Sequence, residues 1–317
     1  MGAKLIMSRM KNKHKAHEIW YYNNGRLKKE NIVAEKWVRL IYESPVGSST
    51  LPYLVKRKFL SYLYGRYCQT EHSAKKIPQF IEENQIDMTG FGYDPQNPHY
   101  KNFTEFFIRE KEVLFSDAPA TLCSPCEGLA TVSTDIDPRK LIAAKGNTFT
   151  LKELFDDRAL GESYAGGTML RLRLTPANYH RMHFFDGGKV NSVKFIDGDL
   201  FSVSPIALNG IARLYCRNKR AVISFSSVNF GDVTIVEVGA TFVGSIVHCF
   251  DEPADVRRGQ QASYFMPGGS LVMIFFKKDA FAPQTELLEH SGEGYETKVA
   301  IGEILGYAPG KQTGGTM

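Results

Sequence analysis

A helical spacing of apolar residues runs through the first third of the chain. From Glu35 to Tyr67 apolar side chains recur at intervals of three and four, and basic residues are interleaved with Tyr and Phe. This composition favours an interfacial helix, because amphipathic rings lie at headgroup depth while cations contact anionic lipid. The same pattern also fits a helix that packs on its own domain and turns its basic face to water. On the first interpretation the residues that contact a membrane are Lys56, Arg57, Lys58, Phe59 and Tyr62.

The pattern changes to that of β-strands from Leu122 onward. Met169 to Leu174, MLRLRL, alternates apolar and polar residues, and Asp232 to Ser245, DVTIVEVGATFVGS, is β-rich and punctuated by glycine. We therefore expect an α+β fold, in which an amphipathic helical region precedes a β-rich domain. The predicted boundaries are 1–110 for the helical, membrane-associating region, 111–310 for the β-rich domain and 311–317 for a flexible tail.

The composition is that of a globular protein with one large core. The chain has 317 residues, 43% of them apolar, which suffices for one large domain with or without a smaller appendage. Its net charge of +5 favours an anionic partner, such as an acidic lipid surface or a phosphate-bearing substrate. We expect no nucleic-acid partner.

Cysteine usage and the lack of long apolar runs bear on the compartment. Five cysteines, an odd number in a long chain, favour a reducing compartment over a secreted disulfide framework. Cys123 and Cys126 form a C-x-x-C, but no second pair follows at zinc-ribbon spacing, so we expect no metal. The start lacks the apolar core of a signal peptide, and no apolar run approaches the roughly 20 residues that a spanning helix requires. We expect a peripheral protein on the cytoplasmic side of a membrane.

Two histidines stand directly after the alternating strand. Pro176 to Gly187 reads PANYHRMHFFDG and contains His180 and His183. Histidine is the side chain whose unperturbed pKa lies nearest to neutrality, so this pair suits acid–base catalysis. A zinc site is disfavoured because the spacing lacks a helix and an obvious third ligand. A structural role for one of the two histidines stays open.

A glycine pair delivers a serine to the start of an apolar run. In YFMPGGSLVMIFF, Gly268 and Gly269 permit backbone conformations that other residues rarely adopt, and Ser270 is followed by six apolar residues. The Ser270 hydroxyl could then reach the carbonyl carbon of Gly269 and attack the peptide bond between the two residues. Gly-Gly-Ser is also a common loop sequence, so the alternative is a serine that merely starts a strand.

Several long motifs in register resemble the phosphatidylserine decarboxylase proenzymes. The motifs are PANYHRMHFFDGG, SPIALNGIARLYCRNKR, NFGDVTIVEVGATFVGSI and RGQQASYFMPGGSLVMIFF. The resemblance continues upstream through ESPVGSSTLPYLVKRKFLSYLYGRY and NFTEFFIRE, and it covers the chain from about Ala34 to Gly306.

The resemblance implies a proenzyme that cuts itself. In this family the serine hydroxyl attacks the preceding carbonyl, and the resulting ester breaks down to leave an N-terminal pyruvoyl group. Carried over to this chain, the cut between Gly269 and Ser270 yields a large and a small subunit, with the pyruvoyl group as a covalent cofactor derived from Ser270. That group is implied to bind phosphatidylserine through a Schiff base, so that carbon dioxide leaves and phosphatidylethanolamine forms. Residues 111–310 are then the pyruvoyl decarboxylase domain, and a homodimer is left open.

The resemblance also implies roles for individual residues. The second histidine of the YHRxH motif, His183, is implied to be the base of an Asp–His–Ser triad, and His180 to take part in the proton transfers of decarboxylation. The family's aspartate lies in an S-P-x-D-G segment, which here reads Ser124-Pro125-Cys126-Glu127-Gly128, so Glu127 takes its place.

Departures from the family pattern keep other functions open. Glu127 is one methylene longer than aspartate, Leu271 stands where a small hydroxyl residue is common, and Pro267 fixes φ before the glycines. One alternative is a related pyruvoyl-dependent decarboxylase of a free amino acid such as tryptophan. Another is an unprocessed, inactive homologue that binds lipid. His248, within a β-rich segment, is expected to be a satisfied core or edge histidine.

Overall fold

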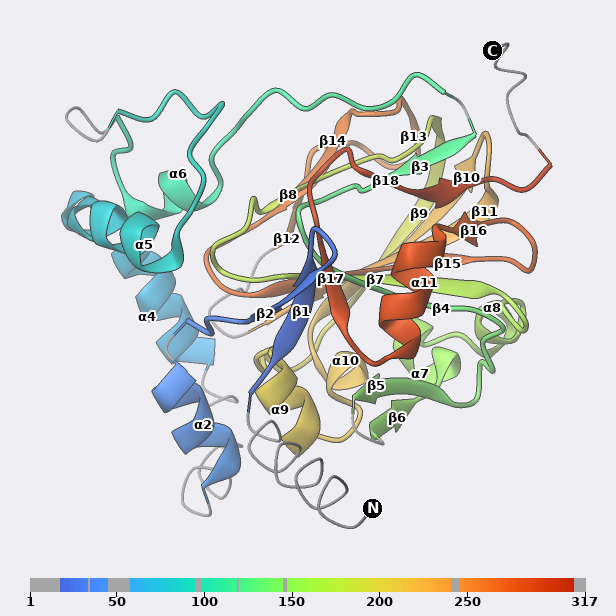
Figure 1. Cartoon of the computed structure of the whole chain (residues 1–317), viewed down its shortest axis with the longest axis horizontal. Helices are drawn as coiled ribbons and strands as arrows, with labels where there is room; N and C mark the ends of the chain where they lie inside the picture. Colours follow the sequence, from blue (N-terminus) through green and yellow to red (C-terminus); the bar gives the residue numbers. More distant parts are fainter. Residues whose placement is uncertain are drawn as a thin grey trace, which may run out of the picture.

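The computed structural model of the chain describes residues 18–33, 35–44, 58–94, 99–118, 120–144, 147–240 and 246–310 (Figure 1). It combines a large sheet with helices packed around it, so the predicted α+β class with a β-rich C-terminal part is confirmed. The helices are α2 (Glu35–Glu43), α4 (Lys58–Cys68), η1 (Glu71–Lys76), α5 (Ile77–Asn84), α6 (Phe103–Phe107), α7 (Leu151–Phe155), α8 (Arg158–Glu162), α9 (Pro205–Gly210), α10 (Leu214–Arg217) and α11 (Thr285–Gly292).

The strands of the large sheet are β1 (Trp20–Asn23), β2 (Arg26–Lys29), β4 (Gly128–Ser133), β7 (Thr168–Leu174), β9 (Gly188–Ile196), β10 (Arg220–Ser227), β11 (Gly231–Gly239), β13 (Ala254–Val256), β15 (Ser270–Phe276) and β17 (Glu296–Val299). Smaller sheets are formed by β3 (Thr121–Cys123), β5 (Leu141–Ala144), β6 (Asn147–Phe149), β8 (Arg181–His183), β12 (Ile246–His248), β14 (Gln261–Phe265), β16 (Ala282–Pro283) and β18 (Ile304–Tyr307).

The large sheet has the strand order β13-β9-β10-β11-β15-β7-β4-β17-β1-β2 within the described part of the chain. Its neighbouring strands pair antiparallel, except for the parallel pair of β1 and β17. Strands β7 and β11 confirm the two strands that the alternation and the β-rich composition predict. Strand β15 lies between them, so the apolar run after Ser270 forms a central strand.

Both faces of β15 are covered, which explains its continuous apolar sequence. Side chains alternate across a strand, so Val272 and Ile274 lie in one core cluster with Phe185. Leu271 and Met273 lie in the cluster on the opposite face, which includes residues of α7 and α10. A strand buried on both faces requires apolar residues at consecutive positions.

A second sheet covers the face of the large sheet to which Val272 points. It has the order β12-β14-β8, and its residues Met182, Ala262 and Phe265 belong to the same core cluster as Val272. The chain passes from β14 of this sheet to β15 of the large sheet through Met266 to Gly269. The serine at the start of β15 therefore lies where the two sheets meet.

The N-terminal region differs from the prediction because it contributes strands as well as helices. Strands β1 and β2 form a hairpin, and β1 extends the large sheet by pairing with β17 (Figure 1). Arg173 of β7 holds this end of the sheet together, since its guanidinium binds Glu30 at 2.8 Å and Glu296 at 3.0 Å. The sequences of these strands, WYYN and RLKK, do not alternate apolar and polar residues, and β17, the partner of β1, lies far along the chain.

The remaining N-terminal elements pack in two places. Helix α2 lies against α9, and the Tyr42 hydroxyl accepts a hydrogen bond of 2.8 Å from the Ser202 amide. Helices α4, α5 and α6 gather to one side of the sheet (Figure 1), around a core that includes Cys68, Ile77 and Phe106. None of the described helices is long and apolar enough to cross a bilayer.

The predicted membrane contacts can be located only in part. Lys56 and Arg57 lie outside the described residues, as does the predicted tail 311–317. Lys58, Phe59 and Tyr62 belong to α4, but the structure describes only their backbone. The amphipathic, membrane-associating character of residues 1–110 therefore stays a prediction.

Candidate active site

Ser270 is the first residue of β15 and is fully buried. The strand register places it between Gly239 of β11 and Leu174 of β7. Two residues earlier, Gly268 has a φ of 148°, in a region that other residues rarely adopt. Gly268 thus provides the backbone conformation with which the chain turns from one sheet into the other before β15 begins at Ser270.

His180 is the histidine that lies next to Ser270. Its Nδ1 atom is 3.3 Å from the Ser270 Oγ atom, and its Nε2 atom is 2.9 Å from the Thr175 carbonyl oxygen. A carbonyl oxygen only accepts hydrogen bonds, so Nε2 carries the proton of the neutral ring. The lone pair of Nδ1 is therefore directed at the Ser270 hydroxyl.

The surroundings of His180 keep its imidazole neutral. The ring is fully buried and stacks on Phe107, with 3.9 Å between the ring centroids. Burial, and secondly the positive charge of Arg109, lower the pKa of His180 from 6.5 to about 3. The neutral form, which is the one that can accept a proton, is therefore present at physiological pH.

Glu127 is connected to His180 through two intervening residues. The Glu127 carboxylate accepts a hydrogen bond of 2.8 Å from the Asn178 side-chain amide. The amide oxygen of Asn178 accepts from the backbone and hydroxyl of Thr175, at 2.7 and 2.8 Å. Thr175 then accepts from His180, so carboxylate and imidazole belong to one hydrogen-bonded chain that ends at Ser270.

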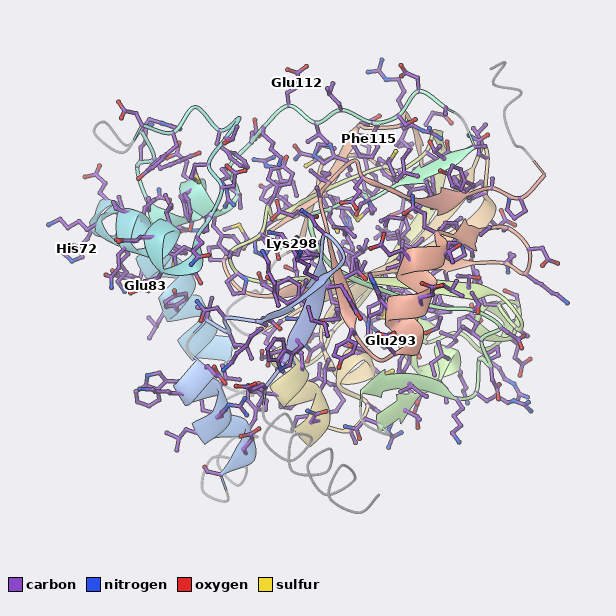
Figure 2. All side chains as sticks on the ribbon, in the orientation of Figure 1. His72, Glu83, Glu112, Phe115, Glu293 and Lys298 are labelled. Carbon is purple, nitrogen blue, oxygen red and sulfur yellow. The ribbon has the colours of Figure 1, made fainter. Side chains whose placement is uncertain are left out.

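His183 lies in a different environment. In β8 its Nδ1 atom is 2.9 Å from the Gly259 carbonyl oxygen and its Nε2 atom is 3.2 Å from the Tyr179 hydroxyl. Burial lowers the pKa of His183 as well. The ring of Phe115, labelled in Figure 2, lies 6.2 Å from the His183 ring. Among the residues that the structure describes, His183 makes no hydrogen bond with Ser270 or Glu127.

The structure therefore joins three of the four predicted site residues, Ser270, His180 and Glu127, and places His183 apart from them. The backbone amide of His183 does bond the Pro125 carbonyl at 2.8 Å, which sets β8 beside the segment that carries Glu127. The catalytic roles that the resemblance implies for the two histidines stay predictions.

Two buried charged residues near the site, Glu237 and Arg109, were not predicted from the sequence as parts of it. Glu237 of β11 is fully buried, and its carboxylate binds His248 and Ser263. Arg109, which is also buried, donates to the carbonyl oxygens of Ala177 and Asn178. The signal for Glu237 was its position as a charged residue inside the apolar strand VTIVEVG.

Comparison with known proteins identifies the class and then the family. A family model described as phosphatidylserine decarboxylase matches residues 100–307. A phosphatidylserine decarboxylase proenzyme of Clostridium perfringens strain SM101 is 40% identical over 283 residues, which is 88% of this chain and 95% of that protein. Proteins of the same name from Clostridium botulinum strain Alaska E43 and Ruminiclostridium cellulolyticum are 40% and 38% identical, over 87% and 90% of this chain and 94% and 95% of their own lengths.

These similarities extend over both the helical and the β-rich parts, so the protein is of the decarboxylase class. The chain belongs to the phosphatidylserine decarboxylase family.

Proposed function

We propose that the chain is a proenzyme that cuts itself between Gly269 and Ser270 and then decarboxylates phosphatidylserine to phosphatidylethanolamine. The observation that carries this proposal is the pairing of the Ser270 hydroxyl with the neutral His180 imidazole at 3.3 Å. A serine hydroxyl is a weak nucleophile and needs a base within hydrogen-bond reach. His180 is such a base for Ser270, the serine of the Gly-Gly-Ser turn.

In the first step His180 takes the hydroxyl proton at Nδ1 while the Ser270 oxygen attacks the carbonyl carbon of Gly269. The peptide C–N bond breaks, the nitrogen takes up a proton, and Gly269 becomes joined to Ser270 by an ester. Loss of the Ser270 α-proton then expels the Gly269 carboxylate and leaves a dehydroalanine. Its tautomer is hydrolysed by water, which releases ammonia and leaves a pyruvoyl group at the start of β15.

The site fits a pyruvoyl group derived from Ser270. The serine is buried, begins a central strand and has neighbours on both sides, Gly239 and Leu174. A small group generated there is held rigidly and shielded from bulk water. Once formed, the pyruvoyl group supplies the electron sink for decarboxylation of an amine-bearing substrate. The residues of the chain orient that substrate, exclude water and return a proton at the α-carbon.

The hydrogen bonds of the uncut chain favour His180 as the base of the first step. The family resemblance gives this role to His183, but the nitrogens of His183 face Gly259 and Tyr179. His180 instead has its protonated nitrogen fixed by Thr175, so its other nitrogen can only accept. Through Asn178 and Thr175, the Glu127 carboxylate helps to hold this orientation.

A lipid substrate requires the site to work at a membrane surface, and the helical region supports a peripheral contact. On α2, Trp37 and Leu40 are 67% and 53% exposed, and Leu63 of α4 is 46% exposed. Exposed Trp and Leu side chains are typical of helices that lie in the interface. Together with Lys56, Arg57, Lys58, Phe59 and Tyr62, these residues form the proposed contact with the cytoplasmic side of the membrane.

The intact mass of the purified protein tests the proposal. We expect two chains, residues 1–269 and a small chain in which a pyruvoyl group precedes Leu271, and the Ser270→Ala variant should stay as one chain. The cut protein should release carbon dioxide from phosphatidylserine vesicles and not from free serine or tryptophan. Release from a free amino acid alone would overturn the lipid substrate. An uncut wild-type chain would overturn self-cleavage, and binding of that chain to phosphatidylserine vesicles would then favour the inactive, lipid-binding homologue.

A further inference from the structure

A buried carboxylate lies one pleat away from the serine that is cut. Glu237 pairs with Val272, and two residues further along each strand Gly239 pairs with Ser270. Residues two apart in a strand point to the same face, so Glu237, Val272 and Ser270 share the face that the second sheet covers. Diagonal neighbours in such a pair lie roughly 7–8 Å apart, with their Cβ atoms somewhat closer.

The Glu237 carboxylate has a partner for each oxygen. One oxygen accepts a hydrogen bond of 2.7 Å from His248 Nε2, and the other accepts from the Ser263 hydroxyl. Both Glu237 and Ser263 are fully buried, and the His248 ring stacks on Phe250. The carboxylate of β11 is thereby bonded to both β12 and β14 of the second sheet.

Stability alone does not account for a carboxylate at this position. Burial of an ionised carboxylate costs several kcal/mol, and a buried ion pair is often no more stabilising than apolar residues of similar volume. The neighbours along this face, Ile235 and Val272, are apolar and belong to the main core cluster. An apolar side chain would suit this environment, so the bonds that Glu237 makes call for another explanation.

The topology explains the position of Glu237, because this residue connects the two strands on either side of the proposed cut. Strand β15 begins at Ser270 and is held by the backbone ladder of β11 from Val233 to Gly239. Strand β14 ends at Phe265, four residues before the cut, and Ser263 bonds the Glu237 side chain. The same residue thus fixes both ends of the segment Met266 to Gly269.

Strand β14 also fixes the base. The Phe265 amide donates a hydrogen bond of 3.0 Å to the His180 carbonyl oxygen, and β14 pairs with β8 immediately after His180. A shift of β14 would therefore move the Gly269 carbonyl and His180 together relative to the Ser270 hydroxyl.

We propose that Glu237, acting through Ser263 and His248, is a positioning residue for self-cleavage, an inference that rests on the function proposed above. Attack by a hydroxyl on a carbonyl requires the reacting atoms to be aligned, and a misplacement of about 1 Å can slow a reaction by about 100-fold. Glu237 takes no part in the proton transfers. It holds β14, and with it the Gly269 carbonyl, in register with Ser270.

The test measures self-cleavage in the full-length proenzyme. Freshly made Glu237→Gln and Ser263→Ala chains should convert to two chains about tenfold to 100-fold more slowly than the wild type, by the loss of alignment. Ser263→Thr keeps the hydroxyl and should recover most of the rate, which a general loss of packing would not allow. Hydroxylamine, which cleaves the ester but not the peptide bond, should trap less ester in the two slow variants.

Glu296→Gln is the matched control. It changes a carboxylate in a different cluster, formed with Arg173 and Glu30, and in the described part of the chain the hydrogen bonds of Glu296 and Glu30 with Arg173 do not involve β14. This variant should lose stability in urea yet cut at the wild-type rate. If Glu237→Gln and Ser263→Ala fold and cut as fast as the wild type, the positioning role is overturned while the proposed function stands. If the wild type itself stays uncut, the proposed function fails and the positioning role fails with it.

Discussion

His180 should make the folded chain lose stability as the pH falls below 6.5. Burial and the charge of Arg109 lower the pKa of this histidine from 6.5 to about 3 in the folded chain. In the unfolded chain the imidazole takes up a proton near pH 6.5, so between the two values the unfolded state binds more protons. The free energy of unfolding therefore rises with pH across this window, and the stability is lost as the pH is lowered through it.

The size of the effect follows from the difference between the two pKa values. Well inside the window each pH unit changes the free energy of unfolding by about 1.4 kcal/mol, and at pH 6.5 by about half as much, so a fall from pH 6.5 to pH 4.5 costs about 2.3 kcal/mol for this group alone. Solvent screening does not reduce the effect, because His180 is fully buried.

Urea unfolding of two matched chains isolates this contribution. The Ser270→Ala chain stays uncut and keeps His180, and the Ser270→Ala, His180→Gln chain lacks the imidazole. Other titrating groups are common to both chains, so their effects cancel in the comparison. Between pH 7 and pH 4.5 the chain with His180 should lose about 2–3 kcal/mol more stability than the chain without it. Equal losses would show that His180 is not held as a neutral, buried base.

Further predictions concern the roles of individual side chains. His180→Gln should slow self-cleavage by about 100-fold or more and His183→Gln by less, because a general base contributes at least that factor; the reverse order, measured by intact mass against time, would make His183 the base. Glu127→Gln should slow the cut by weakening the chain of hydrogen bonds to His180, and an unchanged rate would exclude Glu127 as an orienting group. Replacing the three consecutive cations with Gln should weaken sedimentation with anionic vesicles, and salt should weaken the wild-type binding; unaltered binding would refute the interfacial helix. The cations are Lys56, Arg57 and Lys58.

The strands around the site could be predicted from the sequence, because each one shows a pattern among neighbouring residues. The alternation from Met169 to Leu174 and the β-rich segment after Asp232 became β7 and β11, and the apolar run after Ser270 became β15. A period of two, or a continuous apolar run after a glycine turn, depends only on neighbouring residues. The start of β15 at Ser270 was therefore accessible from the sequence.

The contacts between side chains in the site could not be predicted from the sequence in this way. His180 and His183 are three residues apart in one motif, and only the pairing of β8 with β14 decides which of them meets Ser270. The hydrogen bonds that link Glu127 to His180 likewise pass through Asn178 and Thr175, and no sequence pattern marks these two residues as a link. Such contacts depend on strand register, which is set by the whole sheet.

The helical region and the β-rich domain meet at His180, the proposed base. The boundary predicted at residue 110 assigns Phe107 and Arg109 to the helical region, yet the Phe107 ring stacks on His180 and Arg109 lowers its pKa. Phe106 and Phe107 are buried in the core that α6 shares with α4 and α5. The same cluster of helices that carries the proposed membrane contact therefore also covers the proposed base of self-cleavage. Because the Phe107 ring stacks on the fully buried His180, the helices of the proposed membrane contact are not separable from the proposed chemistry.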